Sequence, residues 1–267
     1  EQEVAATPWR NPSDGDRPIT VAELFSGPGG LVQGVKRFCL DIGVPFESIT
    51  ALDLDRDALR VYERNHQTSF PVSDNDWESH KGDVKRLLKG EKWKKPTITY
   101  GEINTHAKSG QEIESRTDLE DIQERHRSDI ANWKDMIKGK NKAERKKIES
   151  LRPTWSVTNV DAKYDEQPRI NDKGPWGQLK PGDIDLLLAG PPCQGHSNLN
   201  NKTRRDDTKN ELYLIVPAVA AAWNIPLVII ENVEGVIHDV EGVVQQTEGL
   251  FKSMGYTVEK GVLNAAK

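Results

Sequence analysis

Cysteine is almost absent from the sequence, and this excludes two common ways of stabilising a fold. Only Cys39 and Cys193 occur among 267 residues, and neither stands in a Cys-x-x-Cys or Cys/His spacing. Neither a zinc site nor a disulfide framework is therefore expected. Cys39 falls within the helical apolar pattern of residues 31–42, which predicts that its side chain packs in the core.

Long hydrophobic runs are also missing. No run of about 18 apolar residues, the length that a membrane-spanning helix needs, is present. The first residues, Glu1-Gln2-Glu3, lack the basic and then apolar pattern of a signal peptide. We therefore expect a soluble protein of the cytoplasm, associated with the nucleoid if it is bacterial.

Aromatic residues make up only 6% of the chain, whereas charged residues make up 30% and the mean hydropathy is -0.69. Such polarity predicts that part of the chain lies outside the core. The net charge of -5 and the pI near 5.8 argue against binding of polyanions over the whole surface. A local basic face is still compatible with these values.

What is present is an alternation of strand-like and helix-like segments, which predicts an α/β fold with a doubly wound, mostly parallel sheet. Residues 1–18 are expected to be an irregular lead-in to one domain over residues 19–267. The expected strands are 19–25, 48–54, a third that ends just before Gly82, 183–189, 227–230 and 255–263. The expected helices are 31–42, 56–65 and 210–223.

A charged insert at about residues 85–180 interrupts this alternation. Residues 85–152 contain 18 basic and 12 acidic residues, a net charge of +6 in a chain whose total is -5. Residues 111–150 are predicted to form solvated helices. Two interpretations stay open: a charged excursion without a function, or a contact with nucleic acid or another partner.

The first expected strand ends in a glycine-rich turn, Phe25-Ser26-Gly27-Pro28-Gly29-Gly30. In doubly wound sheets ligands bind beyond the carboxyl ends of the strands. A dinucleotide fingerprint is disfavoured, because Val32 stands where that motif needs glycine. The second expected strand ends near Asp53, a carboxylate suited to accept ribose hydroxyls. Asp55 is the alternative, although it is also suited to cap the next helix.

The most informative segment follows the apolar run of residues 186–189. It reads Gly190-Pro191-Pro192-Cys193-Gln194-Gly195-His196-Ser197, which is typical of a stiff loop that presents a nucleophilic thiol. His196 is too close along one tight loop to act as the base of a Cys-His pair, so we interpret it as a loop residue. A second candidate, Glu231, stands at the end of an expected buried strand in Ile-Ile-Glu-Asn-Val.

These segments resemble, in the same order, the motifs of the DNA cytosine-5 methyltransferases. The matching features are the Phe-x-Gly-x-Gly-Gly turn, Gly82-Asp83-Val84, the Pro-Cys-Gln loop at Cys193 and the Glu-Asn-Val segment at Glu231. The resemblance implies a Rossmann-like S-adenosylmethionine-dependent methyltransferase fold. It also implies methylation of carbon 5 of cytosine in double-stranded DNA, as in restriction-modification systems, on a flipped-out base.

The resemblance further implies roles for single residues. Cys193 would add to carbon 6 of the pyrimidine, and Glu231, protonated because burial raises the pKa of a carboxyl, would hydrogen-bond ring nitrogen 3. No metal is implied. The implied S-adenosylmethionine contacts are Phe25, Ser26, Gly27, Gly29, Gly30, Asp53, Leu54, Asp83, Val84 and Pro191. The implied nucleic-acid contacts are Gln194, Ser197, Arg204 and Arg205.

The family's arginine-bearing motif, target-recognition domain and final helix are not found in these 267 residues. We therefore expect either a fragment or a chain whose recognition part is supplied by a second polypeptide. One alternative is a catalytically incomplete, cofactor-binding or regulatory subunit of a split methyltransferase. Another, a nicotinamide-dependent oxidoreductase, is disfavoured by Val32 and by the Cys193 loop. RNA remains an alternative substrate.

Overall fold

The computed structural model describes residues 17–89, 96–105, 111–112, 116–153, 155–192, 212–233, 236 and 242–263. A four-stranded parallel sheet lies at its centre, in the order β2-β1-β6-β7. The strands are β1 (Ile19–Leu24), β2 (Phe46–Leu52), β6 (Leu186–Ala189) and β7 (Leu227–Ile230). From β1 the chain goes to β2 on one side and later to β6 on the other. The predicted doubly wound parallel sheet is confirmed.

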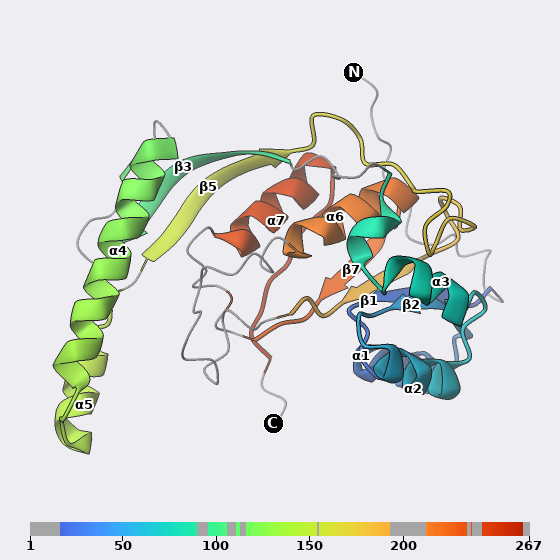
Figure 1. Ribbon diagram of the computed structural model, residues 1–267, viewed down its shortest axis with the longest axis horizontal. Helices are drawn as coiled ribbons and strands as arrows, with labels where there is room; N and C mark the ends of the chain where they lie inside the picture. Colours follow the sequence, from blue (N-terminus) through green and yellow to red (C-terminus); the bar gives the residue numbers. More distant parts are fainter. Residues whose placement is uncertain are drawn as a thin grey trace.

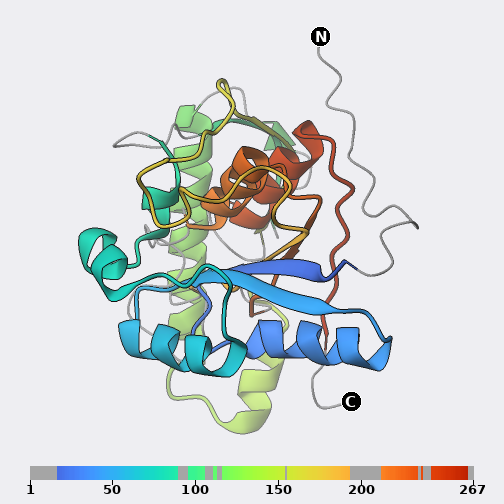
Figure 2. The ribbon, with the colours of Figure 1, turned by 90° about the vertical axis from the view of Figure 1, so that its right-hand side faces the viewer.

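Helices cover both faces of this sheet (Figure 2). One face carries α1 (Gly30–Asp41) and α2 (Arg56–His66), and the other carries α6 (Leu212–Trp223) and α7 (Val243–Ser253). All residues of β1 and β6 are buried, including Thr20 and Glu23 of β1, because both strands lie between two helical layers. Cys39 on α1 is fully buried, as predicted, whereas its neighbour Phe38 is 60% exposed.

A charged arm projects from the body of the molecule (Figure 1). We define the arm as residues 97–163. Its antiparallel sheet has the order β4-β3-β5, from β3 (Thr97–Thr105), β4 (Gln111–Glu112) and β5 (Trp155–Lys163). Two consecutive helices, α4 (Arg116–Ile137) and α5 (Lys142–Glu149), connect β4 to β5. Helices were predicted here, but the long β3-β5 pair was not.

The root of the arm is packed on the body. Ala162 of β5 is fully buried and shares a small apolar cluster with Leu214 of α6 and Leu250 of α7. Other segments of the predicted insert belong to the body outright. Leu87, Trp176 and Leu179 are buried in the main core, and Leu88 forms a β-bridge to Ile170. The insert that we expected at 85–180 therefore overstates the length of chain that leaves the body.

Three expected elements differ from the structure. The segment before Gly82, expected to be a strand, is the helix α3 (Asp74–His80), followed by a short 3-10 helix, η2 (Val84–Leu87). Residues 256–263 have no strand assignment. Strand β7 is half-exposed rather than buried, with Ile229 43% exposed. The reason is that β7 lies at the edge of the sheet and pairs only with β6 among the described strands.

In the described part of the chain, no helix is both long and apolar enough to cross a membrane.

Candidate functional site

The glycine-rich turn joins β1 to α1 in a strained backbone path. Phe25, Gly27 and Gly29 all have positive φ, at 56°, 50° and 96°. Two features exclude a side chain at Gly29. Its positive φ favours glycine, and a Cβ built there would lie 2.4 Å from Nε2 of His66 and 2.9 Å from the Tyr62 ring. Gly29 therefore lets the turn close directly onto α2 at the carboxyl end of β1.

Asp53, just beyond β2, holds this turn in place. Its Oδ2 accepts a hydrogen bond from the backbone N–H of Gly27 at 2.8 Å, and its Oδ1 accepts one from the N–H of Asp55 at 2.7 Å. A carboxylate accepts about four hydrogen bonds, so acceptor capacity remains for a ligand. Asp55 caps α2 by accepting from the N–H groups of Asp57 and Ala58, at 3.0 and 3.1 Å. Asp53 thus remains the better candidate for the predicted ribose contact.

The other predicted cofactor residues lie in different surroundings. Leu54 follows Asp53 and is 65% exposed, so its side chain is free to pack on a ligand. Asp83 caps η2 by accepting from the N–H of Lys85 at 3.0 Å. Val84 is only 4% exposed and belongs to the main core, which leaves little of its surface for the predicted contact with an adenine ring.

Glu23 is a candidate that the sequence reasoning missed. It is 1% exposed on β1, and burial raises the pKa of its carboxyl to about 8. Hydrogen bonds from the Tyr62 hydroxyl and the Val32 N–H oppose this rise, whereas the charge of Asp53 adds to it. Its Oε2 has no hydrogen-bond partner among the described residues. The only signal in the sequence was one acidic residue within an apolar strand.

The ends of β6 and β7 are tied together where the predicted chemistry lies. The Asn232 side-chain amide donates to the carbonyl oxygen of Pro191 at 2.7 Å, and the N–H of Glu231 donates to the carbonyl of Ala189 at 3.0 Å. A Cβ built on Gly190 would lie 3.7 Å from the Phe25 carbonyl oxygen and 4.0 Å from Glu231 Oε2. The start of the predicted nucleophile loop therefore lies close to both the glycine-rich turn and Glu231.

The expected burial of Glu231 is wrong. Its side chain is exposed, because β7 is an edge strand and Glu231 extends past its end. Burial was the expected reason for a protonated Glu231 carboxyl, and the structure does not show this burial. Any desolvation of Glu231 must therefore come from a bound base or from chain that closes over it.

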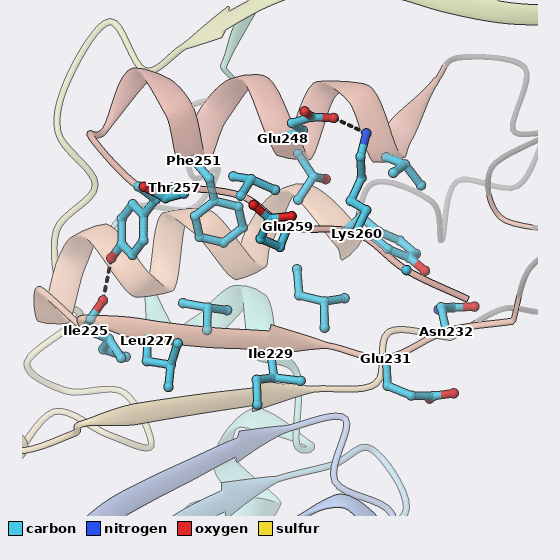
Figure 3. Close-up of a pocket in the computed structure, with 18 of the residues that line it drawn as sticks. Ile225, Leu227, Ile229, Glu231, Asn232, Glu248, Phe251, Thr257, Glu259 and Lys260 are labelled. Carbon is cyan, nitrogen blue, oxygen red and sulfur yellow. Dashed lines mark hydrogen bonds and ion pairs between the residues drawn. The ribbon is translucent and has the colours of Figure 1, made fainter. Parts of the chain in front are cut away.

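A large pocket runs along the exposed edge of β7, with a volume of about 1070 Å³. β7, α7 and residues 255–263 line it, mostly with apolar side chains such as Ile229 and Phe251 (Figure 3). Glu231 and Asn232 lie at one end of it, and an ion pair between Lys260 and Glu248 lies on the opposite wall. The pocket follows the edge of the sheet, so it is distinct from the turn that carries the predicted cofactor contacts.

Several predicted residues lie outside the described part of the chain. These are Cys193, Gln194, His196, Ser197, Arg204 and Arg205. Pro191 is described and buried, and Pro192 is the last described residue before the predicted nucleophile. Their predicted roles accordingly stay predictions.

The architecture now defines a class of protein. A doubly wound parallel sheet carries a strained glycine-rich turn, a half-buried carboxylate on the adjacent strand and a second acidic strand end, all at the carboxyl edge where the strand order reverses. This architecture is consistent with an S-adenosylmethionine-dependent methyltransferase fold.

Comparison with known proteins shows which families the chain resembles. Residues 139–267 match the model of the C-5 cytosine-specific DNA methylases. The chain is 28% identical over 249 residues to the type II methyltransferase M1.BsuMI of Bacillus subtilis, covering 93% of this chain and 39% of that protein. It is 25% identical to DNA (cytosine-5)-methyltransferase 2 of Zea mays, covering 83% of this chain and 25% of that protein. A shorter match, 33% identical over 108 residues, relates it to the type II methyltransferase M.NlaIV of Neisseria lactamica, over 35% of this chain and 26% of that protein.

The chain is thus similar to the C-5 cytosine-specific DNA methylases, whose model matches residues 139–267. Over most of its length it is also similar to the methyltransferases of Bacillus subtilis and Zea mays. It spans about two fifths of the length of M1.BsuMI and a quarter of that of the maize protein. The resemblance drawn from four short motifs is thereby confirmed.

Proposed function

We propose that the protein methylates carbon 5 of cytosine in double-stranded DNA, with S-adenosylmethionine as the methyl donor and Cys193 as a covalent nucleophile. The observation that carries this proposal is the connection between the ends of β6 and β7. The bond from Asn232 to Pro191 holds the strand end bearing Glu231 against the segment that leads into Cys193. The match of residues 139–267 to the C-5 cytosine-specific DNA methylases supports the choice of cytosine and of DNA.

The residues at the carboxyl edge fit the proposed cofactor. Asp53 has free acceptor capacity for ribose hydroxyls, and the exposed Leu54 beside it offers an apolar surface. Glu23 places an unpartnered buried oxygen on β1, the strand that leads into the glycine-rich turn. S-adenosylmethionine, when bound, supplies the electrophilic methyl group that carbon 5 of the pyrimidine accepts.

The chain's own residues then perform the covalent chemistry. The Cys193 thiolate forms a bond to carbon 6, and the electron pair of the 5,6 double bond moves toward carbon 5. Glu231 hydrogen-bonds ring nitrogen 3 and stabilises the charge that builds on the ring. After methylation, loss of the proton on carbon 5 returns an electron pair to the ring, which restores the double bond and expels the thiolate. A paired base hides carbon 6, so the cytosine must first leave the stack.

A trapping experiment tests the proposal. The chain, alone and with any co-encoded polypeptide, is incubated with S-adenosylmethionine and a duplex in which every cytosine is 5-fluorocytosine. Fluorine at carbon 5 cannot leave as a proton does, so the covalent complex should accumulate and survive denaturing electrophoresis. Cys193→Ala should abolish it, and Glu231→Gln should slow its formation by about 100-fold or more, the usual range for a positioned acid.

The chain contains a matched control, because its other cysteine is remote from the proposed chemistry. Cys39 is buried in α1, and Cys39→Ala should leave adduct formation intact in folded protein. An adduct that persists in Cys193→Ala would contradict the proposed nucleophile. Cofactor binding without any adduct, in the presence of the co-encoded polypeptide, would instead support a cofactor-binding or regulatory subunit.

A further inference from the structure

The end of the arm carries most of the net positive charge of the insert. We define the basic tip as residues 138–152, which contain seven basic and only two acidic residues in a chain of net charge -5. The tip comprises the turn after α4, the whole of α5 and the turn that follows it. No residue of α5 is buried, so its charged side chains face solvent.

The basic tip is nevertheless a well-defined structure. Asn141 caps α5 by accepting from the N–H groups of Ala143 and Glu144, both at 3.0 Å, while the Glu144 carboxylate accepts from the N–H of Asn141 at 3.1 Å. Trp133 of α4 donates its indole N–H to the carbonyl of Ile148 at 2.8 Å. The guanidinium of Arg152 lies 5.5 Å from the Trp133 ring centre. These contacts fix α5 against α4 and so hold the charges in one arrangement.

Helix stability accounts for only part of this charge. Lys146 and Lys147 lie in the last turn of α5, where the helix dipole favours cations. Lys140 and Lys142 lie at the opposite end, where the dipole disfavours them. Both are exposed, and neither forms an ion pair with a carboxylate of the described chain. Their positions oppose the local preference of the helix, which points to an external anion.

We propose that the basic tip binds the phosphate backbone of the DNA duplex, away from the cytosine that is being methylated. This inference rests on the proposed function, which makes DNA the polyanion present. Figure 1 shows the ends of β6 and β7 pointing toward the side of the molecule on which the arm lies. A duplex carries one negative charge per roughly 1.7 Å of its axis, so a cluster of lysines finds phosphates whatever the base sequence. The contact therefore adds affinity without sequence preference.

The test is the salt dependence of duplex binding by the full chain. Fluorescence anisotropy with a labelled duplex, at a series of salt concentrations, gives the slope of log affinity against log salt. In the variant Lys140→Gln/Lys142→Gln the slope should become smaller by about 2, because each phosphate contact contributes close to 0.9. Both substitutions remove cations from the start of a helix, so the variant should fold as stably as the wild type.

The matched control removes two exposed lysines of the body, outside the arm. Lys180 stands shortly before β6, and Lys173 lies in the segment that contacts Arg86. Lys173→Gln/Lys180→Gln changes the net charge equally but should leave the slope within about 0.5 of the wild type. Equal effects of the two double variants would overturn the proposal, since only the total charge would then matter.

The outcome separates this inference from the proposed function. A covalent adduct at Cys193 together with a slope unchanged in Lys140→Gln/Lys142→Gln would overturn the role of the tip and leave the methylation intact. That result would favour an acidic protein surface as the partner of the tip. A slope that depends on the tip, without any adduct, would support the DNA contact while contradicting the catalytic role of Cys193. Absence of duplex binding by the wild-type chain at low salt would overturn the contact as well.

Discussion

The sheet body and the arm hold their charged residues in opposite ways. In the body, Glu23 is buried against Tyr62, and Asp53 uses both oxygens to fix the backbone of neighbouring loops. On the arm, Lys140 and Lys142 are exposed and unpaired within the described chain. These two acidic side chains of the body are buried or hydrogen-bonded to backbone, whereas the two lysines of the arm are exposed and available to a partner. Burial and pairing, rather than the charge itself, distinguish the two uses.

The largest difference should come from the same substitution made at one glycine in each region. Gly29 and Gly139 both have positive φ, at 96° and 73°, but only Gly29 has atoms where a Cβ would go. Gly29→Ala should lower the free energy of unfolding by about 3 kcal/mol or more, through overpacking added to backbone strain. Gly139→Ala should cost only about 1 kcal/mol, from strain alone. Chemical denaturation measures both, and equal losses would break the comparison.

The substitution Glu23→Gln tests the comparison through the pH dependence of folding stability. The pKa of Glu23 in the folded protein is about 8, above its ordinary value of 4.5, so the folded state holds this proton more tightly than the unfolded state does. The stability that the proton contributes is complete below pH 4.5 and is lost as pH rises through 8. From pH 5 to pH 8, wild-type stability should therefore fall by a few kcal/mol relative to the variant.

The measurement is urea denaturation of both proteins across this pH range. Glu149→Gln on α5, where no residue is buried, is the control and should follow the wild-type curve at every pH. A constant difference between Glu23→Gln and the wild type would mean that Glu23 does not hold a proton in the folded state.

The smallest effect should come from the two helix caps. Asp55 caps α2 in the body and Asn141 caps α5 on the arm, each by accepting two backbone hydrogen bonds. Asp55→Ala should lower global stability by about 1 kcal/mol. Asn141→Ala should leave the global transition almost unchanged and increase amide hydrogen exchange within α5 alone, because α5 buries no side chain in the core. A matching fall in both melting temperatures would show that the arm and the body unfold as one unit.

The sequence predicted the body better than the arm for a physical reason. Apolar runs such as residues 186–189 form strands wherever they are covered on both faces, and this signal is local. Strands β3 and β5 pair across about fifty residues of intervening chain and are rich in polar residues, so no local pattern marked them. The opposite error occurred at residues 255–263, where the sequence predicted a strand and the structure assigns none.

The candidate site divides in the same way. Gly29, Asp53 and Asp55 could be placed from turn and capping chemistry, because those rules depend on adjacent residues. The exposure of Glu231 could not, because it depends on β7 being at the edge of the sheet. Glu23 was overlooked because an acidic residue in a buried strand becomes notable only when its neighbours are known. Its partner Tyr62 comes from the second helix of the fold.

The antiparallel pairing of β3 and β5 determines how freely the arm can change in sequence and length. Thr97 at the start of β3 lies opposite Lys163 at the end of β5, so the chain departs from the body and rejoins it at neighbouring points. An appendage attached at adjacent points can grow, shrink or acquire a new end without altering the spacing of the four parallel strands. Within one lineage, the charge and length of the arm, and with them the proposed affinity for DNA, are thus free to change while the parallel sheet stays constant.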